Sequence, residues 1–114
     1  MIALLILAFF LSVEIAPESV RYGILSSFKE GDAVAVIDSK QVYSSFREYQ
    51  IIKREGIEQG TARYNLLMST CTKRYKALLK KHASGRYVLV VEVGGITDYK
   101  TTNITRTLID SKGL

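Results

Sequence analysis

The stretch Ala33-Val34-Ala35-Val36-Ile37-Asp38-Ser39-Lys40-Gln41 passes from one structural pattern to another within a few residues. Its first half is a run of small and β-branched apolar side chains, bounded by Gly31-Asp32 and Asp38-Ser39, and such a run is typical of a buried strand. Asp38 or Ser39 can cap a helix that begins at once, because a side-chain oxygen there accepts a hydrogen bond from the first helical turn. We therefore predict a strand over residues 33–37 that leads directly into a helix.

Two helices follow this strand in the predicted order. Apolar side chains recur at helical spacing from Val42 to Tyr49 or Gln50, and Gly56 and Gly60 then interrupt the pattern. A longer helix is predicted from about residue 61 to residue 83, and Gly85 ends it. A single apolar seam steps by three and four residues along this helix and predicts its buried face: Tyr64, Leu67, Met68, Cys71, Tyr75, Leu78 and His82.

A second strand and a closing helix complete the pattern. Residues 86–93, Arg-Tyr-Val-Leu-Val-Val-Glu-Val, are the best strand candidate, and Gly94-Gly95 ends it. A last helix is predicted from about Tyr99 to Lys112, opened by Asp98. Two strands joined by a helical crossover should be parallel. A parallel sheet of only two strands needs cover on both faces, so the fold predicts a partner or a homo-oligomer.

The N-terminal side of the opening stretch is different in character. Residues 26–32 are a short polar linker, and residues 2–13 contain no charge. Twelve residues, of which only Ser12 is polar, form a helix of about 18 Å, which is short against a hydrocarbon core of about 30 Å. A span that reaches residue 25 carries a polar stripe on one helical face, Glu14, Glu18 and Arg21. We expect an anchor whose helix leaves the bilayer near Glu14, since burying charge there is costly.

A cleaved signal peptide is the alternative, but no Lys or Arg precedes the apolar run and Glu14 stands where a small residue is needed. The predicted organisation is thus a membrane anchor over residues 1–25, a linker over residues 26–32 and a small soluble domain over residues 33–114. The predicted fold class is α/β: an N-terminal membrane helix followed by a small β–αα–β–α domain with two parallel strands. Charge alone does not set the orientation across the membrane.

Composition limits the possible classes of function. The chain has 114 residues and a formal net charge of +5, which suits one modest domain. Residues 63–86 hold seven Lys or Arg side chains and no Asp or Glu, and this stretch accounts for the excess positive charge. Cys71 is the only cysteine, which excludes an internal disulfide and a CxxC or zinc-cysteine site.

No catalytic constellation is present in the pattern. His82, the only histidine, lies on the helix seam, where a structural role is favoured over catalysis. Cys71 lies on the same helix about 16 Å away, too far for a nucleophile–base pair. We expect no enzyme activity, no cofactor and no metal. A hydrolase that uses His82 or Glu92 is the rival interpretation.

Two further features have simpler explanations than chemistry. Gly94-Gly95 follows a strand but lacks the second half of a dinucleotide fingerprint, so a turn is favoured over a phosphate site. Asp38 and Glu92 belong to different predicted strand ends, and nothing in the pattern brings them together as an acid–base pair.

The basic helix surface is the candidate binding site. We predict that it binds partners through Lys73, Arg74, Lys76, Lys80 and Lys81. A solvated face is the plain alternative, and attraction to anionic headgroups of a membrane is another. Nucleic-acid binding is less favoured, because Tyr64 and Tyr75 lie on the core seam and are not available to stack on bases.

The order of these elements resembles the TrbI family of F-type conjugative transfer systems. The likeness is carried by Tyr22-Gly23-Ile24, by residues 33–41, by the helix from Arg63-Tyr64-Asn65 to Lys80-Lys81-His82, and by Tyr87-Val88-Leu89-Val90-Val91. The anchor departs from the family, being shorter and carrying glutamates.

The resemblance implies a non-enzymatic, single-pass protein of the bacterial inner membrane, with its soluble domain in the periplasm. As an accessory or scaffold subunit of a type IV secretion apparatus, it would contact other envelope subunits and influence pilus assembly or retraction. A fainter likeness, to periplasmic Skp/OmpH chaperones, is the alternative, although the helical excursion here is much shorter.

Overall fold

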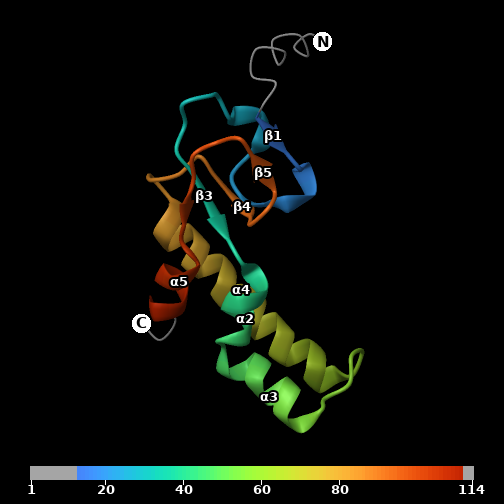
Figure 1. Cartoon of the computed structure of the whole chain (residues 1–114). Helices are drawn as coiled ribbons and strands as arrows, with labels where there is room; N and C mark the ends of the chain where they lie inside the picture. Colours follow the sequence, from blue (N-terminus) through green and yellow to red (C-terminus); the bar gives the residue numbers. More distant parts are fainter. Residues whose placement is uncertain (1–12, 112–114) are drawn as a thin grey trace. The chain divides into compact units, whose positions relative to one another are not determined.

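The computed structural model describes residues 13–111 of the chain, and Figure 1 shows their elements in chain order. These residues fall into two units. Unit 1 holds residues 13–37 and 83–104, and unit 2 holds residues 38–82 and 105–111. The β-strands belong to unit 1, and the α-helices lie in unit 2 except for the last residue of α4, so we describe the units separately.

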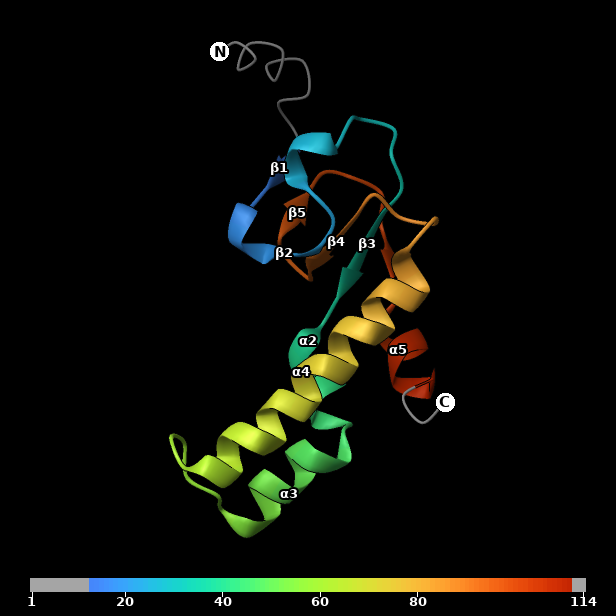
Figure 2. The same cartoon turned by 180° about the vertical axis from the view of Figure 1, so that it is seen from behind.

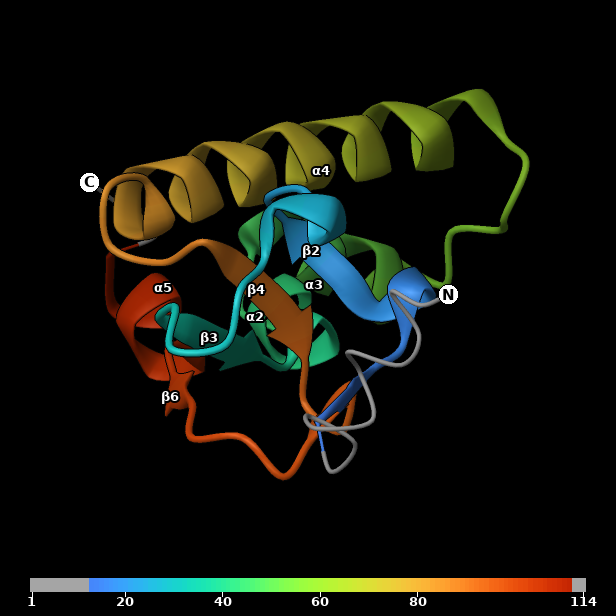
Figure 3. The same ribbon diagram turned by 90° about the horizontal axis from the view of Figure 1, so that it is seen from above.

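A four-stranded mixed sheet organises unit 1, with the order β2-β4-β3-β6 (Figure 3). Its strands are β2 (Val20–Tyr22), β3 (Val34–Ile37), β4 (Leu89–Glu92) and β6 (Thr102–Asn103). Strand β3 is central, parallel to both β4 and β6, and all four of its residues are buried. Its uninterrupted apolar sequence fits a strand that is covered on both faces. Strand β2 is antiparallel to β4.

A second, two-stranded sheet and two 3₁₀ turns cover part of unit 1. Strand β1 (Glu14–Ile15) pairs antiparallel with β5 (Ile96–Thr97), and the turns are η1 (Pro17–Ser19) and η2 (Leu25–Ser27). Side chains from this region pack against a cluster of Val34, Val36, Leu89 and Val91: Ile15, Val20, Leu25, Phe28 and Ile96. Ile15, Val20 and Leu25 of the predicted anchor therefore contribute to a protein core.

The predicted membrane helix is wrong for residues 13–25, which form β1, η1, β2 and the start of η2. Pro17 begins a 3₁₀ turn, and the residues around it pair with strands far away in the sequence. Within residues 13–111, no helix has both the length and the apolar character needed to cross a membrane. This finding contradicts the predicted fold class and the predicted single-pass inner-membrane location. The rest of the predicted anchor, residues 1–12, lies outside the described residues.

The sheet also corrects the predicted β–αα–β–α order. Strands β3 and β4 are parallel neighbours, as the helical connection between them predicts. The sheet nevertheless has four strands instead of two. Residues 96–103, expected to lead into and begin the last helix, form β5 and β6. Asp98 lies between them with φ 55°, a left-handed turn conformation, and so does not cap a helix.

Unit 2 is helical. Its helices are α2 (Ser39–Ser44), α3 (Arg47–Glu55), α4 (Ala62–Ala83) and α5 (Thr105–Ser111), of which α4 ends one residue inside unit 1. Asp38 caps α2 as predicted, since its carboxylate accepts from the backbone N–H of Gln41 at 3.1 Å. Gly56 ends α3 in the left-handed conformation. The backbone is extended at Phe46 and interrupts the helix there, so α2 and α3 are two helices where one was predicted.

Helix α4 carries the core of unit 2 on one face, and α3 runs beside it (Figure 2). Thr61 caps α4, because its hydroxyl accepts from the backbone N–H of Tyr64. The predicted seam is confirmed at Cys71, Tyr75 and Leu78, which are buried. Tyr64 and Leu67, nearer the start of the helix, are only half-buried. A short hydrogen bond between Ser39 and Tyr75 ties α2 to this seam.

Candidate functional site

The clearest candidate site is a set of exposed lysines on α4, which we call the lysine face: Lys73, Lys76, Lys80 and Lys81. Helix α4 contains no Asp or Glu. The salt bridges within residues 13–111 involve arginines alone, so none of these four ammonium groups lies within ion-pair distance of a described carboxylate. The site is therefore a surface of one charge sign that no acidic group of the described chain neutralises.

Nearby carboxylates of unit 2 are already engaged by arginines. Glu48 on α3 accepts two hydrogen bonds from Arg74, at 2.8 and 3.3 Å. Glu55, at the end of α3, lies 2.9 Å from Arg63. Arginine suits these pairs because its planar guanidinium matches a carboxylate with two parallel bonds. The lysines are left facing solvent.

Arg74, predicted as a member of the binding surface, is instead part of the packing between α3 and α4. Besides its bond to Glu48, its guanidinium lies 5.4 Å from the centre of the Phe46 ring. Its side chain is 35% exposed and that of Glu48 is 19% exposed. Arg74 therefore differs from the four lysines beside it, although the sequence alone gives all five the same appearance.

The pKa of the Glu48 carboxyl lies below its ordinary value of 4.5. Burial by itself raises this pKa, but the hydrogen bond from the residue's own backbone N–H and the charge of Arg74 together outweigh it. Burial also raises the pKa of the Cys71 thiol. Cys71 is thus held in the protonated form, which is a poor nucleophile.

His82 has a neighbour that sequence reasoning missed. Its Nε2 atom lies 2.8 Å from the hydroxyl of Ser111 on α5, and that hydroxyl also donates to the carbonyl of Leu108 at 3.2 Å. Ser111 is only 8% exposed. A nucleophile needs access to substrate, so this pair fits a structural link between α4 and α5 better than a catalytic dyad. The two residues are 29 positions apart, and no local pattern of residues indicates that they lie close together.

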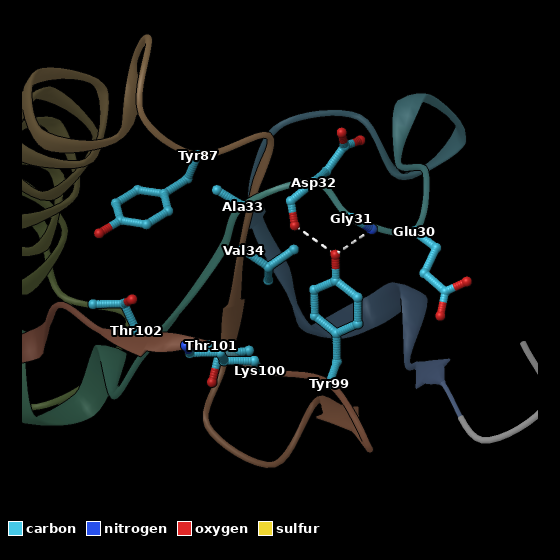
Figure 4. A pocket seen from close by; sticks show the side chains of 10 residues that line it. All are labelled: Glu30, Gly31, Asp32, Ala33, Val34, Tyr87, Tyr99, Lys100, Thr101 and Thr102. Atoms are coloured by element: carbon cyan, nitrogen blue, oxygen red, sulfur yellow. Dashed lines mark hydrogen bonds between the residues drawn. The ribbon is translucent and has the colours of Figure 1, made fainter.

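A pocket of about 470 Å³ in unit 1 is the second candidate (Figure 4). Its floor is Ala33 and Val34, at the start of β3, and the rings of Tyr87 and Tyr99 stand on opposite sides of this floor. Glu30, Lys100 and the pair Thr101-Thr102 complete the wall.

One of the two tyrosines of this pocket is held firmly by hydrogen bonds. The Tyr99 hydroxyl donates to the carbonyl of Asp32 at 2.5 Å and accepts from the N–H of Gly31 at 2.8 Å, and its ring meets Phe28 edge-on. Tyr99 is thus a fixed part of the turn before β3. The pocket lining includes two acidic residues, Glu30 and Asp32, and one basic residue, Lys100, so it presents charges of both signs to a ligand.

The other residues singled out in the sequence, in the predicted polar stripe and at Glu92, lie in strands or turns of unit 1. Glu14 lies in β1 and Glu18 in η1, so the predicted polar stripe with Arg21 does not form. Arg21, in β2, pairs with Glu92 at 3.1 Å and donates to the carbonyl of Glu18. Glu92 is therefore held in an ion pair.

Gly94-Gly95 forms the turn between β4 and β5. A side chain at Gly95 would place its Cβ 2.2 Å from the Ser19 hydroxyl oxygen, which explains the glycine by packing. Within residues 13–111, no three of the His, Cys, Asp and Glu side chains come close enough together to hold a metal ion.

Comparison with known proteins adds no family to this description. Neither family models, nor curated proteins, nor solved structures gave a match to the chain.

Proposed function

We propose that this chain is a non-enzymatic binding subunit, and that its lysine face docks the acidic surface of another protein. The observation that carries the proposal is a group of four exposed lysines on a helix without acidic residues, none of them paired with a carboxylate of residues 13–111. A surface of one sign raises the rate at which an oppositely charged partner arrives and disfavours partners of like charge.

Stabilisation of the helix by its dipole accounts for only part of the positive charge on the lysine face. Lys80 and Lys81 lie in the last turn of α4, where positive charge complements the helix dipole. Lys73 and Lys76 lie further from the helix end, and the dipole interaction falls off within the last turn. These two lysines therefore favour an intermolecular role over helix stabilisation.

The likeness to TrbI proteins gives the class of partner that we propose: subunits of an F-type conjugative transfer apparatus. In this role the chain is an accessory subunit, and its removal alters pilus assembly or retraction. Support for this finer proposal comes from the residue pattern alone, so its test must identify the partners directly.

Crosslinking in cells followed by mass spectrometry tests the proposal. Two variants of equal net charge make it specific: Lys73→Glu/Lys76→Glu/Lys80→Glu on the lysine face, and Lys29→Glu/Arg86→Glu/Lys100→Glu on unit 1. We expect a fixed set of protein partners that is lost only in the first variant. Equal loss in both variants would show a general charge effect, and crosslinks mainly to nucleic acid would assign a different function.

A further inference from the structure

The outward side of α4 has a regular spacing as well as a charge. Opposite the buried seam lies an exposed stripe of five residues: Leu66, Ser69, Lys73, Lys76 and Lys80. Successive members are three or four residues apart, so they fall on one face of the helix. The stripe is about 21 Å long and contains two series with a seven-residue repeat: Leu66, Lys73 and Lys80 form one, and Ser69 and Lys76 form the other. This is the spacing of residues along the contact between two packed helices.

The first residue of this stripe is apolar and unusually exposed. Leu66 is 68% exposed, the highest value among the large exposed hydrophobic residues of the described chain. It stands seven residues before Lys73 and thus occupies the same position of the repeat. The stripe therefore offers a partner an apolar contact at one end and a row of positive charges along the rest of its length.

We propose that the lysine face and Leu66 together dock an acidic amphipathic helix of a partner protein. This inference rests on the proposed function and specifies the partner for the same site. The partner presents carboxylates at three- and four-residue spacing opposite Lys73, Lys76 and Lys80, and an apolar side chain opposite Leu66. Charge complementarity and the seven-residue repeat are the observations that select this occupant.

The helix dipole fixes the direction of the partner. The lysines lie in the C-terminal half of α4, and acidic residues are most favourable near the N-terminus of a helix. An antiparallel partner brings its own acidic N-terminal half beside these lysines. Its apolar anchor then follows the acidic residues in the partner's sequence, next to Leu66.

Designed peptides of about 20 residues test this inference, because shorter helices are marginal in water. The matched peptide carries three Glu at positions i, i+4 and i+7 and a Leu seven residues after the last Glu, which is the order in which an antiparallel helix meets Lys80, Lys76, Lys73 and Leu66. The first control has the same composition with the Leu placed before the Glu residues, and the second contains a central Pro that breaks the helix. Affinities are measured by fluorescence anisotropy on the full chain at low ionic strength.

We expect the matched peptide to bind about tenfold more tightly than either control, a difference of about 1.4 kcal/mol. Adjacent single variants add a second readout. Lys80→Ala, on the stripe, should weaken binding about threefold, whereas Lys81→Ala, one residue off the stripe, should have a clearly smaller effect. Leu66→Ser should weaken the matched peptide more than the reversed one.

Several outcomes would overturn this inference while leaving the proposed function intact. Equal binding of the helical and Pro-containing peptides would mean that the face takes any acidic segment. Equal effects of the Lys80 and Lys81 substitutions would show that only diffuse charge matters. Tighter binding to a DNA duplex or to anionic vesicles than to the matched peptide would exclude the acidic helix as ligand. The proposed function is tested separately by the crosslinking, and it fails if the protein partners survive reversal of the lysine face, if both charge reversals lose them equally, or if the crosslinks are mainly to nucleic acid.

Discussion

Residues of the same charge have different roles within about one turn of α4. Arg74 is bound to Glu48 by two hydrogen bonds and rests against Phe46, whereas Lys73 and Lys76 on either side of it face solvent. The guanidinium can satisfy a half-buried carboxylate with fixed geometry, and an ammonium is more strongly hydrated. Removing Arg74 should therefore alter stability, and removing the lysines should alter binding.

The pair of Glu48 and Arg74 predicts a dependence of stability on pH. The pKa of Glu48 is lowered in the folded chain, so the ionised pair stabilises the fold fully above the unfolded value near 4.5. This contribution is lost as the pH falls through the lower folded pKa. At neutral pH, Glu48→Gln should reduce the free energy of unfolding by about 1 kcal/mol, since partial exposure of Arg74 screens the pair. The deficit should shrink in urea titrations as the pH falls below about 4.5, and a constant deficit would contradict the assignment.

Gly23 predicts a second effect at the scale of one residue. Its φ is +95°, and a Cβ there would lie 2.1 Å from the backbone oxygen of Val88. Gly94 has a similar φ of +90°, but a Cβ there would meet nothing within 4 Å, which makes it a matched control. Gly94→Ala should cost about 1 kcal/mol for the backbone conformation alone. Gly23→Ala should cost at least about 3 kcal/mol because backbone must also move. Equal losses in thermal unfolding would show that the close contact is relieved cheaply.

At the scale of elements, α4 has two faces with separate roles. Its inner face buries Cys71, Tyr75 and Leu78, and its outer face exposes Leu66 and the lysines. An apolar seam on one side and charge on the other is a local pattern, and for this reason the helix and its core could be predicted from the sequence. The cap at Asp38 was predictable for the same reason.

A pair of leucine substitutions separates these two faces. Leu78 is 6% exposed, so Leu78→Ala should lower the free energy of unfolding by about 2–5 kcal/mol through lost burial and a cavity. Leu66→Ala, on the same helix, should change the free energy of unfolding by less than about 0.5 kcal/mol, because Leu66 is 68% exposed. Chemical denaturation measures both. Similar losses for the two variants would mean that the outer face is already packed in the isolated protein.

The short strands could not be predicted in the same way. Strands β1, β5 and β6 have two residues each, too few for any alternation to be visible. They exist because they pair with strands distant in the sequence, as Glu14 does opposite Thr97. Tertiary pairing thus overrides the local helical pattern that suggested a helix from Tyr99 onward. The link between His82 and Ser111 and the pocket between Tyr87 and Tyr99 depend on the same kind of long-range contact.

At the scale of the whole molecule, charge is divided between the two units. The described residues of unit 1 hold six acidic and four basic side chains, whereas those of unit 2 hold five acidic and eleven basic ones. The positive charge of the chain is thus a property of unit 2. The hydrophobic N-terminal pattern, by contrast, was misleading: it predicted a helix through residues 14–22, but within unit 1 Glu14–Ile15 and Val20–Tyr22 pair as strands and Pro17–Ser19 form a 3₁₀ turn between them.

This uneven charge predicts how fast a partner arrives. The matched acidic peptide should associate about tenfold more slowly when ionic strength rises from about 0.05 to about 0.5 M, because salt shortens the range over which exposed charges act. Its dissociation rate should change much less, since the contact at Leu66 does not depend on salt. Stopped-flow mixing measures both rates. When Lys73, Lys76 and Lys80 are replaced by Glu, the association rate at low salt should fall to the high-salt rate or below. The control variant with Glu at positions 29, 86 and 100 of unit 1 should keep most of the salt dependence. An association rate that ignores salt in the unmodified chain would show that the lysine face does not steer its partner.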